Sequence, residues 1–338
     1  MKKIGIIIGT ERDLIPSQEY YTKYKKIFQE SLEELDLNVG RYDLSYDIQI
    51  FALAKKFAPK NVEIIPLWKL EYTLKELNEL DLIYCIYEFP PALQDYGIDG
   101  PKKLKRLLKN TTTKTLPSYE FLDFVYKKES YMKFFKKNNI PILDTLFYNL
   151  NLYKKDKNNL KLLMKRIENK FKGKPFFCKP EGSSFAEGTR LFKRLNIKTM
   201  KNYLENCLKK GFNKILIQPF IQEFLKYYEI KTIWLNGKFE YAYGIKALMD
   251  REFIGHYEID PKLLKMLVEK GKEVLRLIKK KFGIPFMLRI DWGCCLQNDN
   301  LCRDYFLNEI EFSPAMNHED SFKGDFFKKI AQSLPKRL

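Results

Sequence analysis

The sequence predicts an α/β protein whose first third is an open, parallel sheet flanked by helices. Short apolar runs, which are typical of buried strands, alternate there with stretches of helical periodicity. The chain has 338 residues, more than a usual single domain, so it has room for two or three packed modules. We therefore expect an open α/β domain first, followed by further helices and strands.

The first predicted strand is Lys2–Gly9. The glycines around it fit neither a dinucleotide-binding turn nor a P-loop, so a nucleotide site must lie elsewhere. In the helix that follows, apolar side chains recur at three- and four-residue spacing and mark one buried face: Tyr21, Tyr24, Phe28, Leu32 and Leu35. Val62–Pro66 and Leu82–Tyr87 are predicted as further strands. Because strands and helices alternate, the sheet should be parallel.

A polar, strand-like stretch at Thr111–Pro117 leads into a helix predicted over Tyr119–Asn138, and we place the first domain boundary there. A strand, a helix and the hairpin-like segment Lys174–Leu195 follow. The remaining predicted elements, before a last helix, are strands near Lys214–Phe220, Glu229–Leu235 and Phe239–Lys246, an amphipathic helix over Pro261–Phe282, and strands at Phe286–Trp292 and Tyr305–Phe312. The predicted units are residues 1–118, 119–220 and 221–338.

The chain is strongly basic, with 61 Lys and Arg against 43 Asp and Glu and a formal charge of +18. Such a charge attracts nucleotides, phosphorylated substrates, nucleic acid or anionic membranes. The lysines are dispersed through nearly every predicted helix, which a general compositional bias explains equally well. No nucleic-acid motif is present, and no apolar stretch approaches the roughly 18 residues that span a bilayer. We expect a cytoplasmic protein with no nucleic-acid or membrane partner.

Cysteine and histidine argue against two common kinds of site. The six cysteines form no C-x-x-C pair, and the chain has only two histidines. A zinc site or a histidine-based catalytic triad is therefore not expected.

The most informative segment is Lys179-Pro180-Glu181-Gly182-Ser183-Ser184, where two strand-like runs flank a loop of small residues. Backbone N–H groups and serine hydroxyls in such a loop can surround phosphate oxygens, and a lysine at the strand end adds a positive charge. The alternative is an ordinary hairpin turn.

Two strands near the C-terminus carry alternating charges. Side chains on a strand alternate between faces, so Arg289 and Asp291 point the same way, as do Glu309 and Glu311. If the strands are neighbours, three carboxylates and one guanidinium converge. Oxygen ligands combined with nucleotide phosphates suit Mg²⁺ or Mn²⁺. The alternative is a salt-bridged face of a solvated sheet.

From about Tyr119 to Asn317 the chain resembles the ATP-grasp superfamily, particularly the D-alanine–D-alanine ligases and the RimK-like amino-acid ligases. The resemblance implies a two-lobed α+β ATP-grasp fold after a pre-ATP-grasp α/β domain. Residues 119–220 would be the central lobe with the phosphate loop. Residues 221–338 would be the C-terminal lobe with the metal site.

The resemblance also implies residue roles in binding ATP. Lys128, ahead of a helix that ends at Asn139-Ile140-Pro141, and Lys179 would contact the phosphates. The other implied ATP-binding residues are Gly182, Ser183 and Ser184 over the phosphates, Gln218 with the backbone of Phe220 and Ile221 at the adenine, and Glu229 at the ribose hydroxyls. Lys246 would reach the γ-phosphate, although an exposed strand-end lysine is the other interpretation.

For the metal, Arg289-Ile290-Asp291 matches the Arg-x-Asp of these ligases, and Glu309-Ile310-Glu311 resembles their Glu-x-Asn. Asp291, Glu309 and Glu311 would be the ligands of Mg²⁺ or Mn²⁺. Glu311 departs from the pattern, because the named ligases usually have Asn there. It places one more negative charge at the metal.

The implied reaction joins a small carboxylate to an amine-bearing substrate. The carboxylate attacks the γ-phosphate of ATP to give an acyl phosphate and ADP, and the amine then attacks the acyl phosphate. Arg289 would stabilise the oxyanion of that second step. Two alternatives stay open: a kinase acting on a small polyanionic acceptor, which the charge of +18 would suit, and a non-catalytic ATP-binding module. A homodimer is a common outcome in the family.

Overall fold

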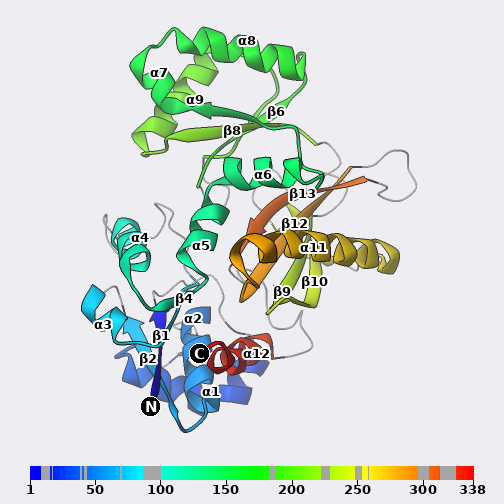
Figure 1. Cartoon of the computed structure of the whole chain (residues 1–338). Coiled ribbons are helices and arrows are strands. Elements are labelled where there is room, and N and C mark those ends of the chain that lie inside the picture. The colour runs from blue at the N-terminus through cyan, green and yellow to red at the C-terminus, as the bar shows by residue number, and fades with distance from the viewer. Residues whose placement is uncertain are drawn as a thin grey trace.

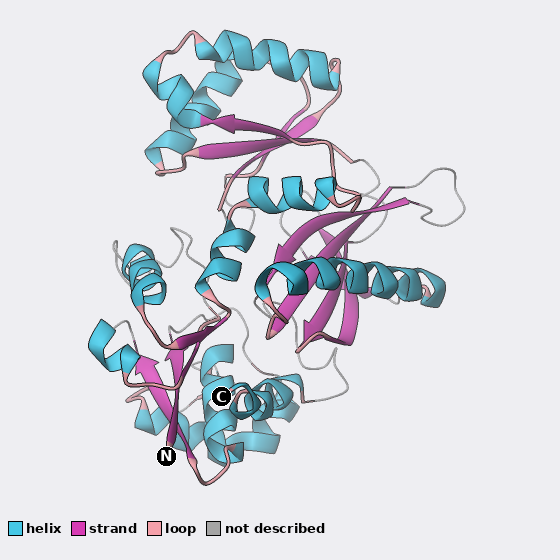
Figure 2. Ribbon diagram, in the orientation of Figure 1, coloured by secondary structure: helices cyan, strands magenta, loops and turns pink. Residues whose placement is uncertain are grey.

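A computed structural model describes residues 1–8, 16, 18–38, 40–41, 44–68, 71–86, 100–182, 188–221, 229–247, 253–257, 259–295, 304–312 and 325–338. Within these residues the strands form three sheets, each with its own helices (Figures 1 and 2). The predicted serines Ser183 and Ser184 lie outside the described residues.

The N-terminal domain is built on a parallel sheet, as predicted, and its strand order is β2-β1-β3-β4. Its strands are β1 (Lys2–Ile8), β2 (Val62–Trp68), β3 (Leu82–Tyr84) and β4 (Lys114–Leu116), and its helices are α1 (Gln18–Glu34), α2 (Tyr46–Phe57), α3 (Leu74–Asn78) and α4 (Gly100–Asn110). The apolar face predicted for α1 is confirmed, since all five of its residues are buried. The isoleucines of β1 are fully buried, as expected for the centre of a parallel sheet.

The central lobe is an antiparallel sheet of order β5-β8-β6-β7 with helices packed on one face (Figure 1). It contains β5 (Leu146–Asn149), α7 (Leu150–Lys155), α8 (Asn159–Phe171), β6 (Phe176–Pro180), β7 (Arg190–Phe192), α9 (Ile197–Lys209) and β8 (Lys214–Pro219). The predicted hairpin is the β6–β7 pair. The lobe has its own hydrophobic core, in which Phe176 stacks between Phe171 and Phe192 at ring-centroid distances of 5.4 and 5.2 Å.

The C-terminal lobe is an antiparallel sheet of order β11-β10-β9-β12-β13, crossed by a long helix (Figure 1). It contains β9 (Glu229–Leu235), β10 (Lys238–Ala247), β11 (Phe253–Tyr257), α11 (Pro261–Phe282), β12 (Met287–Cys295) and β13 (Asp304–Glu311). Asp260 caps α11 by accepting a hydrogen bond from Leu263 N at 2.9 Å. On the helix-covered face, Trp234 and Trp292 both donate to Thr232 Oγ1, which fixes two large side chains in the core.

The single helix predicted over Tyr119–Asn138 is wrong in one respect. The structure has two helices, α5 (Tyr119–Tyr126) and α6 (Lys128–Lys137), which meet at Lys127, where ψ is 77°. Both pack with the C-terminal lobe, where Phe124 contacts Phe282 at a ring-centroid distance of 4.9 Å. Because the helix breaks at Lys127, α6 begins at Lys128 and lies between the two lobes (Figure 1).

The last helix, α12 (Phe326–Ser333), returns to the N-terminal domain and packs on α2, and a 3₁₀ turn (Pro335–Arg337) follows it. Ion pairs connect it to two domains: Lys23 of the N-terminal domain pairs with Asp325 at 2.8 Å, and Lys329 pairs with Glu240 of the C-terminal lobe at 2.8 Å. The helix therefore ties the first domain to the third.

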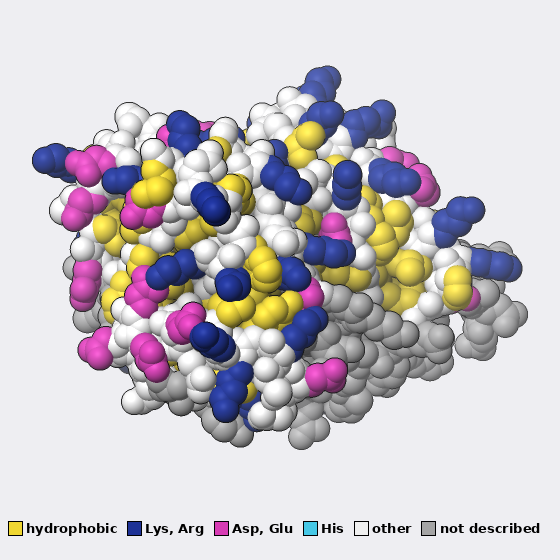
Figure 3. All heavy atoms as spheres, turned by 90° about the horizontal axis from the view of Figure 1, so that it is seen from below, with side chains coloured by type: hydrophobic (Ala, Val, Ile, Leu, Met, Phe, Trp, Pro, Cys, Tyr) yellow, Lys and Arg dark blue, Asp and Glu magenta, His cyan; other side chains and the backbone are white. Residues whose placement is uncertain are grey.

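The surface agrees with the dispersed lysines of the sequence. Figure 3 shows one face of the molecule, on which Lys and Arg side chains are scattered singly among acidic, apolar and other side chains. Among the described residues, no helix has both the length and the apolar character to cross a bilayer.

Replacing Gly271 by Ala should destabilise the C-terminal lobe. A Cβ at this position in α11 would lie 2.3 Å from Cζ2 of the buried Trp234. Alanine improves helix propensity by about 1 kcal/mol, but overpacking against a rigid ring costs up to about 3 kcal/mol. We expect a net loss of about 2 kcal/mol in urea unfolding. Lys272→Ala, on the exposed side of the same helix, is the control and should change little; equal stability of both variants would contradict the packing.

Candidate functional site

Charged and tyrosine side chains form a row across the face of the C-terminal sheet that α11 does not cover. In register, Tyr243 of β10 lies opposite Lys231 of β9, Lys231 opposite Asp291 of β12, and Asp291 opposite Glu309 of β13. In the next row Arg289 lies opposite Glu311. Opposite residues of antiparallel strands share a face. The predicted convergence of the charged side chains of β12 and β13 is therefore confirmed.

The other face of the same two strands is apolar, as predicted. Leu288, Ile290, Ile310 and Phe312 are all at most 2% exposed. Their burial fixes which face the charged residues occupy, since a shift of one residue would place the charges in the core.

Asp291 is the centre of the charged face. Arg289 binds it through two hydrogen bonds, from Nε to Oδ1 at 2.8 Å and from Nη2 to Oδ2 at 3.0 Å, and Lys231 also donates to Oδ2. Burial alone would raise the pKa of Asp291, but Arg289 and then Lys231 outweigh it and lower that pKa below its usual value. Asp291 is therefore an anion held between two cations.

Lys231 is buried, like the carboxylate it binds. It is 5% exposed and forms a second ion pair with Glu229 Oε2 at 3.0 Å. Burial would lower the pKa of Lys231, but Asp291 and Glu229 outweigh it and raise that pKa to about 12. Lys231 thus links the predicted ribose-binding residue to a predicted metal ligand.

Lys128 reaches the same face from the first turn of α6. It is 8% exposed and forms an ion pair with Glu309. The break between α5 and α6 places it there, because the chain turns at Lys127 just before α6 begins. The structure therefore brings together Lys128 and Glu309, which the sequence assigned to the phosphates and the metal.

Lys179 comes from the other lobe, near the end of β6. Burial, followed by the positive charge of Lys128, lowers the pKa of Lys179, and Glu229, Asp291 and Glu311 oppose both effects, so that the pKa is about 7. These groups are residues that the sequence assigned to one site: Lys128 to the phosphates, Glu229 to the ribose, and Asp291 and Glu311 to the metal. With a pKa near 7, Lys179 is protonated only in part at neutral pH. A bound anion would raise this pKa and favour the charged form.

The predicted adenine-binding segment begins in the last residues of β8 and continues to Ile221. Gln218 is 5% exposed and donates to Thr145 Oγ1 at 3.0 Å, and Phe220 packs edge-to-face on Phe177. Phe220 N donates to Pro175 O at 3.1 Å, so this N–H is already used. The N–H of Phe220 is therefore not available to adenine, whereas these bonds do not affect the contact predicted for the backbone of Ile221.

Glu229 is oriented by its neighbours. Its Oε1 accepts a hydrogen bond from Asn308 Nδ2 at 2.6 Å, and its Oε2 pairs with Lys231.

The loop that the sequence assigned to the phosphates is described only at its ends, where Gly182 has a φ of +75°. The side chain of Lys246, at the end of β10, lies outside the described residues.

Three residues of this site were missed from the sequence: Lys231, Asn308 and Tyr243. Strand alternation could have found Lys231, because it lies two residues after Glu229 and so on the same face. Asn308 and Tyr243 have no comparable signal. Their positions follow from strand pairing, which brings β10 and β13 to either side of β9 and β12.

The carboxylates are partly engaged by the protein's own cations. In the described parts of the chain, no three acidic, cysteine or histidine side chains are grouped closely enough to hold a metal ion as they stand. Asp291 and Glu309 nevertheless share a register position and a face, and carboxylate oxygens are the ligands that Mg²⁺ and Mn²⁺ prefer. A divalent cation bound here would replace Lys128 at Glu309 and share Asp291 with Arg289 and Lys231.

Raising the pH should stabilise the wild type relative to Lys179→Met. The pKa of Lys179 is lowered from 10.5 to about 7, so between these values the unfolded chain binds more protons than the folded one. The variant should be the more stable protein near pH 7, and its advantage should shrink toward pH 10. Urea unfolding of both proteins across this range measures the gap; a gap that does not change with pH would contradict the assignment.

No family model matches the chain, and no curated protein matches it. Solved structures do. D-cycloserine synthetase DcsG matches with a TM-score of 0.65 at 11% identity, over 99% of this chain and 99% of that chain. A RimK domain ATP-grasp protein from Sphaerobacter thermophilus matches with a TM-score of 0.56 at 10% identity, over 99% and 98%.

A D-alanine–D-alanine ligase from Bacillus anthracis complexed with ATP matches with a TM-score of 0.55 at 15% identity, over 100% of this chain and 99% of that chain. At these identities the likeness concerns the fold. It extends over nearly the whole length of each chain and includes both kinds of ligase that the sequence resembles. The protein has the fold of the ATP-grasp ligases.

Proposed function

We propose that this protein is an ATP-dependent carboxylate–amine ligase that forms an acyl phosphate and releases ADP. One observation carries the proposal: two lysines from different lobes reach the same acidic face of the C-terminal sheet. Lys128 pairs there with Glu309, and the charges of Glu229, Asp291 and Glu311 act on Lys179. Cations from two lobes facing acidic residues on a third element suit a magnesium–triphosphate complex.

Different residues would bind the phosphates, the adenine and the ribose of ATP. Lys128 and Lys179 would bind the phosphates with the loop of Gly182, Ser183 and Ser184, while Gln218, Phe220 and Ile221 would border the adenine. Glu229 would accept hydrogen bonds from the ribose hydroxyls, and Asn308 holds its carboxylate in place. Binding of the phosphates would attract Lys128 away from Glu309, which frees that carboxylate.

Asp291, Glu309 and Glu311 would hold the divalent cation. Bound Mg²⁺ or Mn²⁺ would bridge phosphate oxygens and neutralise charge that develops during transfer. Glu311 adds a carboxylate where related ligases usually have Asn, and the nearby Arg289 Nη2, 3.8 Å from Glu311 Oε1, offsets part of that charge.

Arg289 would stabilise the oxyanion formed when the amine attacks the acyl phosphate. It is 7% exposed, and its two bonds to Asp291 fix the plane of the guanidinium. Asp291 and Glu311 outweigh the effect of burial and raise the pKa of Arg289, so the group stays charged. A charge held in place before reaction needs no reorganisation during it.

Incubation with magnesium, ATP, pooled small carboxylates and hydroxylamine should give a hydroxamate together with ADP. Hydroxylamine is a strong amine nucleophile and traps the acyl phosphate. Glu309→Ala should lose both products at any magnesium concentration. A phosphorylated acceptor with ADP and no hydroxamate would instead establish a kinase, and ATP binding without turnover in the presence of substrates would establish a non-catalytic module.

Arg289→Ala should slow product formation about 10²- to 10³-fold, the usual cost of removing one group that stabilises an oxyanion, while ATP affinity stays within about threefold. Arg289→Lys is the matched variant: it keeps the charge but loses the planar two-bond contact with Asp291. Its rate should therefore lie between those of the wild type and Arg289→Ala. Steady-state rates with calorimetric ATP binding separate the effects. Equal loss of both in Arg289→Ala would contradict the assigned role.

A further inference from the structure

Three charged residues connect the two lobes close to the proposed phosphate lysines. Lys214, the first residue of β8, lies 2.5 Å from Glu129 Oε2 and 3.2 Å from Glu181 Oε2. Glu181 Oε1 in turn accepts a hydrogen bond from Glu129 N at 2.8 Å. We call this set the Glu129–Glu181–Lys214 triad. None of its contacts was needed for the site described above.

The triad differs from an ordinary surface ion pair, which contributes little to stability. The side chains of Glu181, Glu129 and Lys214 are 15%, 21% and 29% exposed, and each makes more than one of these contacts. Burial would lower the pKa of Lys214, but Glu129 and Glu181 outweigh it and raise that pKa. Shared, partly buried contacts of this kind fix geometry better than a single exposed pair.

Glu181 also completes a helix that lacks a cap of its own. The residue before α6, Lys127, makes no side-chain capping bond. Glu181, which is 52 positions further along the chain, accepts the N–H of Glu129 in the first turn of α6 instead. A carboxylate at a helix N-terminus is favourable because it meets free N–H groups and the positive end of the helix dipole. The cap of α6 is thus supplied by the central lobe.

Two residues of the triad lie close to the proposed phosphate lysines in the sequence. Glu129 directly follows Lys128, and Glu181 lies two residues after Lys179. The helix α6 belongs to the core shared with the C-terminal lobe. Phe176 and Cys178 of β6 and Ile215 and Ile217 of β8 belong to the core of the central lobe, whereas Leu216 of β8 packs in the first core. The triad therefore joins two lobes with largely separate cores at the points where the two lysines emerge.

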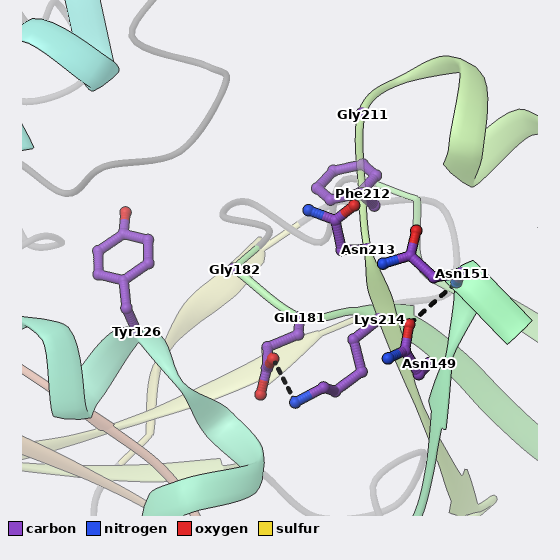
Figure 4. A pocket seen from close by; sticks show the side chains of 9 residues that line it. All are labelled: Tyr126, Asn149, Asn151, Glu181, Gly182, Gly211, Phe212, Asn213 and Lys214. Atoms are coloured by element: carbon purple, nitrogen blue, oxygen red, sulfur yellow. Dashed lines mark hydrogen bonds and ion pairs between the residues drawn. The ribbon is translucent and has the colours of Figure 1, made fainter.

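Packing fills this junction only in part. Figure 4 shows Glu181 and Lys214 pointing toward each other at a cavity of about 390 Å³, with Tyr126 of α5 on its other side. Open space on one side of a contact leaves fewer apolar atoms to resist relative movement. The ionic contacts are then a restraint on the angle between the lobes in addition to the packing of Leu216.

We propose that the Glu129–Glu181–Lys214 triad is an electrostatic latch between the lobes that positions Lys128 and Lys179 for one triphosphate. This rests on the proposed function for its consequence at ATP. The triad residues are positioning residues, since none of them is placed on the nucleotide. Loss of the latch lets α6 and β6 move apart, and the two lysines no longer meet the phosphates together.

The test compares ATP with adenosine in calorimetry with magnesium, using Lys214→Met. We expect ATP affinity to fall about tenfold and adenosine affinity to stay within about twofold, because adenosine needs neither lysine. Lys214→Arg should restore most of the ATP affinity. Lys170→Met is the matched control: Lys170 is a partly buried lysine of the same lobe that pairs with Asp144 at 2.6 Å, away from the junction. Equal changes for both ligands, or no change for ATP, would overturn the latch.

A measurement without nucleotide separates the latch from the proposed function. Spin labels on noncanonical residues at Leu162 of the central lobe and Lys272 of the C-terminal lobe, both exposed, report the distance between the lobes. Lys214→Met should broaden that distribution, and Lys170→Met should not. An unchanged distribution in Lys214→Met overturns the latch even if wild-type protein binds ATP. A broadened one, with wild-type protein that binds no ATP, keeps the latch and removes the proposed function.

Discussion

The buried carboxylate of Asp291 is the constraint on which the site depends. A buried anion is costly unless it is paired and hydrogen-bonded, and here Arg289 and Lys231 provide both. The bond from Lys231 crosses from β9 to β12, where the two residues lie opposite each other, and the pairing of β12 with β13 brings Glu309 and Glu311 to the same face. An apolar substitution of the cluster could be equally stable. The charges are therefore better explained by binding an ionic ligand than by stability.

The protein's own cations pair with the carboxylates that we propose as metal ligands. Lys128 neutralises Glu309, and Lys231 and Arg289 neutralise Asp291. A cluster of carboxylates would otherwise repel itself, so the free protein needs such partners. In the proposed function, a bound magnesium–nucleotide complex would replace these partners, so the net buried charge would change little. The helix α6 carries Lys128 and is capped from the other lobe, so it joins this charged face to the lobe junction.

Local patterns located much of this site. Alternation on β12 and β13 predicted the shared face of Arg289, Asp291, Glu309 and Glu311, and the small-residue loop after Lys179 indicated a phosphate site. The helix over Tyr119–Asn138 was predicted as continuous because nothing at Lys127 is a helix breaker. The break depends on α6 packing against the C-terminal lobe. Lys231 was overlooked since a lysine in a strand is commonly exposed, and only the pairing of β9 with β12 shows that this one is buried against Asp291.

The sequence by itself determined the order of strands and helices along the chain, the parallel first domain and the shared face of the charged side chains on β12 and β13, because periodicity and residue type are local properties. Tertiary structure decided what lies opposite what. The row from Tyr243 to Glu309, the pairing of Lys128 with Glu309 and the Glu129–Glu181–Lys214 triad each join residues far apart in the chain. Such contacts follow from strand order and lobe packing, and these depend on the whole chain burying its apolar surface at once.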